Sequence, residues 1–170
     1  MTQLIGTSGA DTLTGGDGED HIEGLGGADR LAGGGGADVI VGGFGDTVLD
    51  GGSGIDLGRL DFAGATASLR YSVGVSTQTV AGAQVSGFER VEFVGGSAGD
   101  RLTGGALADR LEGRAGNDWL KGEGGDDRLE GGDGVDILDG GAGADTLDGG
   151  GGTDGCRISA LSRFFASEAK

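Results

Sequence analysis

Apolar residues recur along most of this chain with a period of nine. In most of these nine-residue segments, here called nonamers, one large apolar residue stands eighth, usually between polar or small residues, and six glycine-rich residues precede this triplet. Thirteen nonamers follow this plan, six in residues 6–59 and seven in residues 95–157. An apolar residue flanked by polar ones is typical of a half-buried β-strand, and clustered glycines mark turns. The pattern predicts short strands joined by glycine-rich turns.

The nonamers keep one register throughout. Position one is glycine in all thirteen, position six is aspartate in twelve, and position eight is leucine or isoleucine in eleven. Repetition at a fixed period is the signature of a stacked repeat architecture. We expect the eighth-position side chains to line a narrow interior, where burial of each contributes on the order of 1.5–3 kcal/mol. These residues are Leu13, Ile22, Leu31, Ile40, Leu49, Leu102, Leu111, Leu120, Leu129, Leu138 and Leu147.

Two successive nonamers make one coil, with one strand in each of two opposed sheets. Adjacent strands of a sheet are about 4.8 Å apart, so turns one coil apart lie directly over one another. The sequence therefore predicts an all-β fold, a parallel β-roll (a two-sheet parallel β-helix or solenoid) of GGxGxDxUx repeats, where x is any residue and U is a large apolar residue.

Two regions depart from the repeat. Residues 60–94 lose glycine and contain alternating stretches typical of β-strands. We interpret them as wider coils that continue the stack, with a separate domain as the alternative. Residues 158–170 have apolar residues at helical spacing and predict a short C-terminal helical cap, or part of an export signal. The strands expected in the insert are 60–62, 67–73, 79–85 and 88–94.

The composition disfavours the folding of an ordinary globular domain. The 170 residues include 44 glycines and no proline, and the net charge is −16. Glycine loses the most backbone freedom on folding, and like charges repel one another. Without a source of cations, such a chain is expected to be disordered.

The same numbers exclude several classes of protein. With 12 basic against 28 acidic residues, binding to nucleic acid or to an anionic membrane is not expected. No apolar run approaches the roughly 18 residues of a membrane span. Residues 1–5 have neither a basic region nor a hydrophobic segment, so we expect no cleavable signal peptide. The single cysteine excludes an intramolecular disulfide.

The sixth-position aspartates are the candidate metal ligands. Stacked turns bring their carboxylates to a shared gap, and glycine allows the turn to direct carbonyl oxygens inward. Calcium takes 6–8 oxygen ligands at about 2.3–2.6 Å, whereas one histidine and one cysteine in different blocks do not suit zinc. In one nonamer the acid is shifted to position five, at Asp46. The predicted ligands are Asp11, Asp20, Asp29, Asp38, Asp46, Asp56, Asp100, Asp109, Asp118, Asp127, Asp136, Asp145 and Asp154.

Aspartates one coil apart should share an ion. The pairs Asp29–Asp46 and Asp38–Asp56 are doubtful, because the repeat is shifted or lacks its apolar residue. Ala98 and Leu107 replace the fourth glycine and weaken two other turns. We expect roughly seven to nine calcium ions. About eight would nearly cancel the net charge of −16.

These nonamers resemble the G-G-x-G-x-D-x-U-x repeat of the RTX (repeats-in-toxin, hemolysin-type calcium-binding) family, where U is a large apolar residue. The resemblance implies the same calcium ligation. It also implies passage, unfolded, through a type I secretion channel and folding outside the cell, where calcium is abundant. The expected localisation is therefore secreted or extracellular.

The resemblance leaves the role of the module open. The first hypothesis is a non-catalytic, calcium-folded module of a secreted bacterial protein. The second is an accessory module or fragment of a secreted RTX enzyme, such as a protease, lipase or alginate epimerase. The HExxH motif of zinc proteases is absent, so we expect any catalysis to lie on another segment or chain. The third is an adhesin or surface-layer element.

A few other residues suggest simpler roles. His21 stands seventh in its nonamer and is interpreted as an exposed surface histidine. Cys156 takes a leucine position and should be a small buried apolar residue. Trp119 and Ile137, one coil apart, should be neighbours on an outer face, either an ordinary stacked pair or a docking patch. A solvated charged face is predicted from Arg110, Arg128, Glu112, Glu130 and Asp148.

Overall fold

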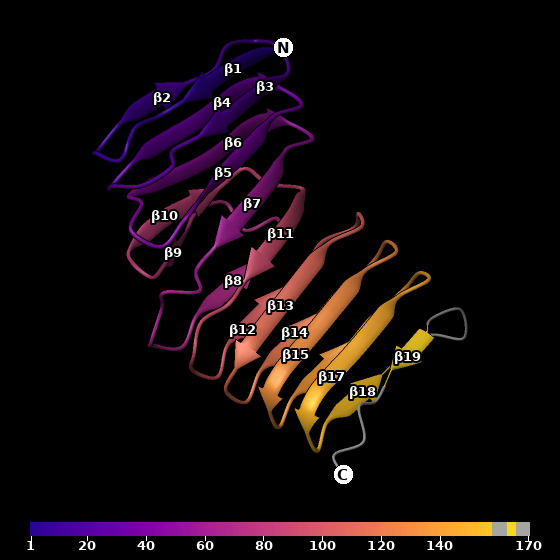
Figure 1. Cartoon of the computed structure of the whole chain (residues 1–170). Helices are drawn as coiled ribbons and strands as arrows, with labels where there is room; N and C mark the ends of the chain where they lie inside the picture. Colours follow the sequence, from indigo (N-terminus) through magenta and orange to yellow (C-terminus); the bar gives the residue numbers. More distant parts are fainter. Residues whose placement is uncertain (158–162, 166–170) are drawn as a thin grey trace. The chain divides into compact units, whose positions relative to one another are not determined.

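Short β-strands form all the regular structure of residues 1–157 and 163–165, the part of the chain that the computed structural model describes (Figure 1). The chain divides into two units. Unit 1 comprises Met1–Asp61 and Gly74–Glu92, and unit 2 comprises Phe62–Val73 and Phe93–Lys170. The insert between the two nonamer blocks is thus divided between the units.

Unit 1 contains two sheets, parallel apart from one strand of the insert, and in the repeat block their strands alternate along the chain. Strands one coil apart pair in parallel, with Leu4 opposite Ile22 in one sheet and Leu13 opposite Leu31 in the other. This register confirms that two nonamers make one coil. The first sheet contains β1 (Thr2–Ile5), β3 (Asp20–Glu23), β5 (Val39–Gly43) and β7 (Leu57–Asp61). The second contains β2 (Thr12–Thr14), β4 (Arg30–Gly36), β6 (Val48–Gly54), β10 (Ala83–Ser86) and β9 (Gln78–Val80).

Unit 2 repeats this arrangement. Leu111 lies opposite Leu129 in one sheet and Leu120 opposite Leu138 in the other, again two nonamers apart. One sheet contains β13 (Arg110–Ala115), β15 (Arg128–Gly134), β17 (Thr146–Gly152) and β19 (Arg163–Phe165). The other contains β8 (Arg70–Ser72), β12 (Arg101–Thr103), β14 (Trp119–Lys121), β16 (Ile137–Asp139) and β18 (Gly155–Arg157). The predicted all-β parallel β-roll is confirmed in both units.

The insert supplies strands to both units. In unit 1, β10 pairs in parallel with β6, and in unit 2, β8 pairs in parallel with β12. The single strand expected over residues 79–85 is wrong. Ala81 and Gly82 both have left-handed φ values, 47° and 97°, and the turn they form separates β9 from β10, its antiparallel partner. β11 (Arg90–Val94) has residues in each unit. That residues 60–94 continue the stack as wider coils stays a prediction.

The predicted C-terminal helical cap falls mostly outside the described residues. Of residues 158–170, the structure describes only 163–165. These three form β19, which pairs in parallel with β17. They are therefore in a strand and not in a helix, because an existing sheet edge offers hydrogen bonds to any extended segment.

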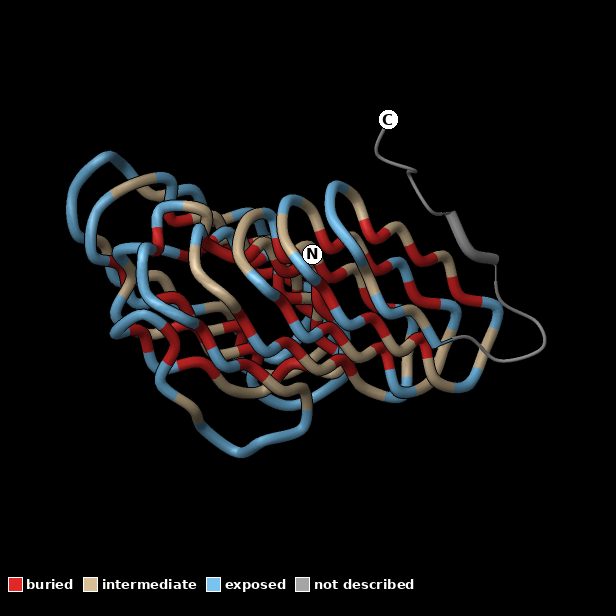
Figure 2. The backbone as a smooth tube through the Cα atoms, turned by 90° about the horizontal axis from the view of Figure 1, so that it is seen from below, coloured by how far each residue is buried: buried red, intermediate tan, exposed pale blue. Residues whose placement is uncertain are grey.

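Each strand of the repeat blocks contributes one apolar side chain to the interior. Ten of the eleven predicted eighth-position residues are fully buried, and Leu13 in the first coil is half-buried. Figure 2 shows the buried positions recurring along successive coils. Where Gly58 replaces the apolar residue, the ring of Phe88 lies 3.2 Å from the place a Cβ would occupy, and Leu60 is buried nearby. An aromatic side chain from the insert thus fills this gap in the core of unit 1.

Unit 2 has a second apolar cluster where its nonamers begin. The ring of Phe93 stacks on Phe62 and on Tyr71, with centroids 5.2 and 4.9 Å apart. All three side chains are buried. Stacked aromatic pairs of this kind contribute about 0.5–1.5 kcal/mol beyond their buried area.

Substitution of the core leucine in β15 tests the interior. Leu129→Ala removes a fully buried side chain, and the narrow core offers little material to refill the space. We expect a loss of about 2–5 kcal/mol in the free energy of unfolding, measured by urea denaturation at saturating calcium. Ile137→Ala, at a side chain 53% exposed on the outer face, is the control and should change it by less than about 0.5 kcal/mol. Equal losses in both variants would contradict a leucine-lined interior.

Candidate metal centre

A ladder of hydrogen bonds links the sixth-position aspartates of successive coils. The backbone N–H of Asp100 donates to Oδ1 of Asp118 at 2.7 Å, and that of Asp118 donates to Oδ1 of Asp136 at 2.8 Å. The two members of each pair stand one coil apart, as the nonamer spacing predicts. The same bond joins Asp11 to Asp29, Asp20 to Asp38, Asp38 to Asp56, Asp109 to Asp127, Asp127 to Asp145, and Asp136 to Asp154.

The second carboxylate oxygen, Oδ2, divides the turns into two forms. In closed turns, Oδ2 accepts the N–H of the second residue of its own turn, as in Gly16 to Asp20 at 2.7 Å. The first two turns of each block are closed. The shifted turn is closed as well, because the N–H of Gly43 donates to Asp46. Both carboxylate oxygens of Asp20, Asp46 and Asp100 thus accept a backbone N–H.

In open turns the second and fourth residues have left-handed φ, and the second N–H does not reach Oδ2. Gly34 and Gly36, with φ of 103° and 125°, form the open turn of Asp38. Three second positions adopt this φ without being glycine: Leu25, Arg114 and Glu123. A left-handed backbone conformation at a residue other than glycine costs of order 1–3 kcal/mol, and it persists only where the surrounding structure enforces it. Six Oδ2 atoms in open turns are buried and accept no hydrogen bond: those of Asp29, Asp38, Asp56, Asp118, Asp127 and Asp136.

The first glycine of each turn makes room for oxygens from two turns. A methyl group on Gly131 would contact Asp136 Oδ2 and would lie 2.6 Å from the carbonyl oxygen of Gly149, one coil later. Any side chain at position one would therefore collide with the carboxylate. A carboxylate oxygen of one turn and the first carbonyl oxygen of the next thus flank the same spot.

This arrangement occurs in eight aspartate pairs of the described residues. It includes Asp38–Asp56, where Gly33 is flanked by Asp38 Oδ2 and the Gly51 carbonyl. Around Gly24, in contrast, the atoms nearest to an added Cβ include Asp29 Oδ2 but not the carbonyl of the shifted turn. The eight pairs are Asp11–Asp29, Asp20–Asp38, Asp38–Asp56, Asp100–Asp118, Asp109–Asp127, Asp118–Asp136, Asp127–Asp145 and Asp136–Asp154.

Stacking buried carboxylates makes their ionisation unfavourable. Burial, together with the charges of Asp109 and Asp145, raises the pKa of Asp127 to about 7. Burial, together with the charges of Asp136 and Asp100, raises the pKa of Asp118 to about 6. In the closed turn of Asp20, hydrogen bonds from the backbone N–H groups of Gly16 and Thr2 lower the pKa instead. Burial raises the pKa of Asp46 and of Asp100 as well, although their turns are closed.

The donor set fits a hard divalent cation. Among the described residues, no three histidine, cysteine, aspartate or glutamate side chains converge into a metal-binding group. A site would therefore combine one or two carboxylates with backbone carbonyl oxygens, the ligands that calcium prefers. The six buried oxygens without a donor are the atoms that such an ion would satisfy.

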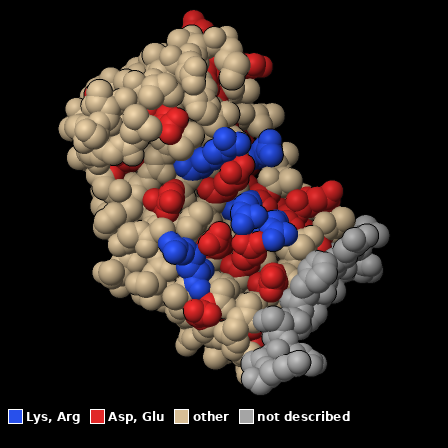
Figure 3. Space-filling view, viewed as in Figure 1, with Lys and Arg blue, Asp and Glu red and all other residues tan. Residues whose placement is uncertain are grey.

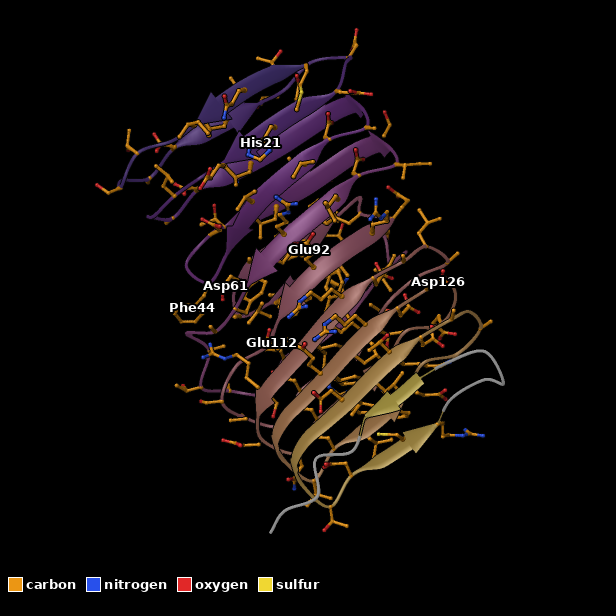
Figure 4. All side chains as sticks on the ribbon, turned by 45° about the vertical axis from the view of Figure 1, so that its right-hand side comes forward. His21, Phe44, Asp61, Glu92, Glu112 and Asp126 are labelled. Atoms are coloured by element: carbon orange, nitrogen blue, oxygen red, sulfur yellow. The ribbon has the colours of Figure 1, made fainter. Side chains whose placement is uncertain are left out.

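Other residues singled out in the sequence lie away from these turns. His21, labelled in Figure 4, is half-buried on β3 with Val39 as its neighbour, and is less exposed than predicted. Cys156 is half-buried beside Leu138. Trp119 and Ile137 are neighbours in register and exposed, and Arg101 lies 3.2 Å above the centre of the indole ring.

The predicted charged face is present on unit 2. Arg110 contacts Glu112 at 3.6 Å and Glu130 at 2.8 Å, and Arg128 also pairs with Glu130. Acidic and basic side chains are interspersed on this surface (Figure 3). Within the described part of the chain, no helix is long and apolar enough to cross a membrane.

Residues 95–99 carry the letters of the G-x-S-x-G nucleophile motif, but their setting differs. That motif requires a strand–turn–helix elbow. Here Ser97 lies in a repeat turn that leads into strand β12, and its hydroxyl donates to the carbonyl of Ala65 at 3.4 Å. The only histidine of the chain belongs to unit 1, whereas Ser97 belongs to unit 2. The serine is therefore part of a repeat turn and not of such an elbow.

The nonamer pattern does not predict one acidic residue of the ladder, Glu89. The N–H of Asp56 donates to Oε2 of Glu89 at 2.9 Å, so a glutamate of the insert takes the place of the next aspartate. No nine-residue spacing marks Glu89. The only signal is Gly87, two residues before it and directly after a β-type segment.

The chain matches one family of known proteins. The family described as RTX calcium-binding nonapeptide repeat (4 copies) matches residues 3–31, 23–57, 94–129, 103–138 and 121–155. These matches cover both nonamer blocks and more than two thirds of the chain. No curated protein matches it. The chain therefore belongs to the RTX, or hemolysin-type, calcium-binding nonapeptide repeat family.

Proposed function

We propose that this chain is a non-catalytic β-roll module of a secreted bacterial protein, and that it folds on binding about eight calcium ions outside the cell. The observation that carries the proposal is the set of six buried carboxylate oxygens that accept no hydrogen bond. Burying a charged group without a partner costs several kcal/mol. A cation bound between successive turns removes this cost.

The charge of the chain supports the same number of ions. Eight pairs of turns bring a carboxylate and a carbonyl oxygen together. Eight divalent ions would carry a charge that balances the −16 of the protein. The thirteen predicted aspartates would then differ in role. Those of open turns would supply a free oxygen, whereas Asp20, Asp46 and Asp100, whose two oxygens both accept backbone hydrogen bonds, would contribute least.

Calcium-dependent folding suits export. Extracellular calcium sites bind at about 10⁻⁴–10⁻³ M, far above cytosolic calcium, so the chain would stay expanded during synthesis and type I secretion. Family membership supports this route. The second candidate, an accessory module of a secreted RTX enzyme, is compatible with the same turns, because the catalytic groups would lie on another segment. An adhesin or surface-layer element would use the same roll as a spacer.

Removal of calcium tests the proposal directly. The burial of one apolar side chain per repeat strand cannot offset the conformational entropy lost when 44 glycines are ordered. We therefore expect an expanded chain in excess chelator and β-structure at millimolar calcium. Far-UV circular dichroism and size-exclusion chromatography during a calcium titration measure both changes. Full strand signal in chelator would contradict the proposal.

Two adjacent aspartates provide a matched test of the ladder. Asp127 is buried in an open turn, whereas the neighbouring Asp126, labelled in Figure 4, is exposed and accepts the N–H of Ala144. Asp127→Asn should abolish the binding of at least one calcium ion. If that site is occupied at a hundredfold its Kd, its loss removes about 2.7 kcal/mol of stability. Asp126→Asn makes the same charge change and should leave calcium stoichiometry unchanged. Stoichiometry from equilibrium dialysis distinguishes the two.

Calcium binding should weaken as the pH falls. Without metal, the folded pKa values of Asp118 and Asp127, about 6 and about 7, lie above the ordinary value of about 3.9. Protonation therefore favours the metal-free roll at low pH, and this contribution is lost as the pH rises through 6 to 7. Since protons and calcium compete, the calcium midpoint should increase between pH 8 and pH 5, with proton release on binding near pH 6. A midpoint independent of pH in circular dichroism titrations would refute this mechanism.

A further inference from the structure

We infer that unit 1 has an additional calcium site outside the nonamer consensus, formed between the turn of Asp56 and a short turn of the insert, residues 87–89, with Glu89 as its second carboxylate. The inference rests on the proposed calcium binding. It concerns residues beyond the repeat match, which ends at 57 and resumes at 94.

The first observation is an unpartnered buried oxygen. Asp56 is fully buried, and its Oδ1 accepts the N–H of Asp38 at 2.8 Å. Its Oδ2 is buried and accepts no hydrogen bond. In the other open turns, the corresponding Oδ2 lies beside the first glycine, on the side of the following coil. For Asp56 the following turn is not a nonamer but residues 87–89.

The short turn supplies the carbonyl oxygen that a nonamer would supply. Ser86 lies opposite Asp50 in the pairing of β10 with β6, so Gly87 follows in register with Gly51. A methyl group on Gly51 would meet the carbonyl oxygen of Gly87 and would lie 2.8 Å from the Cβ of Asp56, and a methyl group on Gly33 would likewise meet the carbonyl oxygen of Gly51. Gly87 has φ of 70°, and a methyl group on it would lie 2.6 Å from the backbone nitrogen of Gly52. The glycine thus allows the same close approach as a first-position glycine.

Glu89 then occupies the place of the sixth-position aspartate. Its Oε2 accepts the N–H of Asp56 at 2.9 Å, the bond that an Oδ1 atom makes elsewhere in the ladder. The turn from Gly87 to Glu89 is shorter than the six-residue turn from Gly51 to Asp56. The additional methylene of glutamate allows the carboxylate to reach the ladder. Glu89 is half-buried, so water can complete the coordination from its side.

The electrostatics favour a cation at this place. Two further carboxylates adjoin that of Asp56, because the N–H of Asp38 donates to Asp56 Oδ1 and the N–H of Asp56 donates to Glu89 Oε2. Asp50 lies close by, since its Oδ1 would be 2.9 Å from a methyl group on Gly87 and accepts the Ser86 hydroxyl at 2.9 Å. Carboxylates and a carbonyl without a sulfur or imidazole ligand suit calcium.

A substitution of nearly the same shape, which keeps the ladder bond but removes the charge, tests the site. In Glu89→Gln, the amide oxygen still accepts the N–H of Asp56, but the negative charge is lost. We expect the full-length variant to bind one calcium ion fewer than the unmodified chain, measured by equilibrium dialysis with calcium alone and metal analysis. The control is Glu92→Gln, at a half-buried glutamate that pairs with Arg59 at 3.3 Å and is labelled in Figure 4. This variant should keep the full stoichiometry.

Equal stoichiometry in Glu89→Gln and the unmodified chain would overturn the site while leaving the proposed function intact. An unmodified chain that binds no calcium would overturn both. Should Glu89→Gln fail to fold, crystals of the unmodified chain grown in calcium give the answer by anomalous scattering. A peak about 2.3–2.6 Å from a Glu89 carboxylate oxygen and the Gly87 carbonyl supports the site. Peaks between nonamer turns but none here would refute it.

Discussion

Both units depend on the hydrogen bond that one carboxylate oxygen of an aspartate accepts from the preceding coil. In six open turns, the other oxygen of the same carboxylate accepts no hydrogen bond. Oδ1 joins each coil to the preceding one by accepting an aspartate N–H, as between Asp118 and Asp136. This bond places the carboxylate inside the stack, where Oδ2 of Asp136 has no donor. The geometry that builds the roll thus also creates an uncompensated charge. Because each repeat strand contributes only one apolar side chain to the interior, apolar burial offsets little of that cost, and in the proposed function a bound cation would offset the rest.

Much of this structure follows from the sequence because the period is strict. A nine-residue repeat with glycine first and aspartate sixth permits one parallel register, and that register determines which carboxylates meet. The eighth-position leucines are buried for the same reason. The two forms of turn, in contrast, could not be predicted from residue types. Gly16 and Gly34 both stand second in their nonamers, yet only Gly34 has left-handed φ. The difference follows the position of the turn in its block, since the first two turns of each block are closed.

The non-periodic parts were harder to predict because their partners are distant in sequence. Phe88, far along the chain, fills the space left by Gly58, and Glu89 completes a ladder that begins with aspartates. Neither role has a spacing signal. The helix expected from apolar spacing near Phe164 gives way, at residues 163–165, to pairing with β17. A free sheet edge outweighs a weak helical preference in so short a segment.

The coil of two nonamers has a consequence for how such chains change length. Gain or loss of two nonamers would move every later strand by one whole level and keep it in its own sheet. Gain or loss of a single nonamer would transfer every later strand to the opposite sheet. The column of Trp119 and Ile137 would then exchange faces with the column of Arg128 and Thr146. Duplication in pairs is therefore the change that preserves the outer surface, and genetic variation in repeat number should favour even steps.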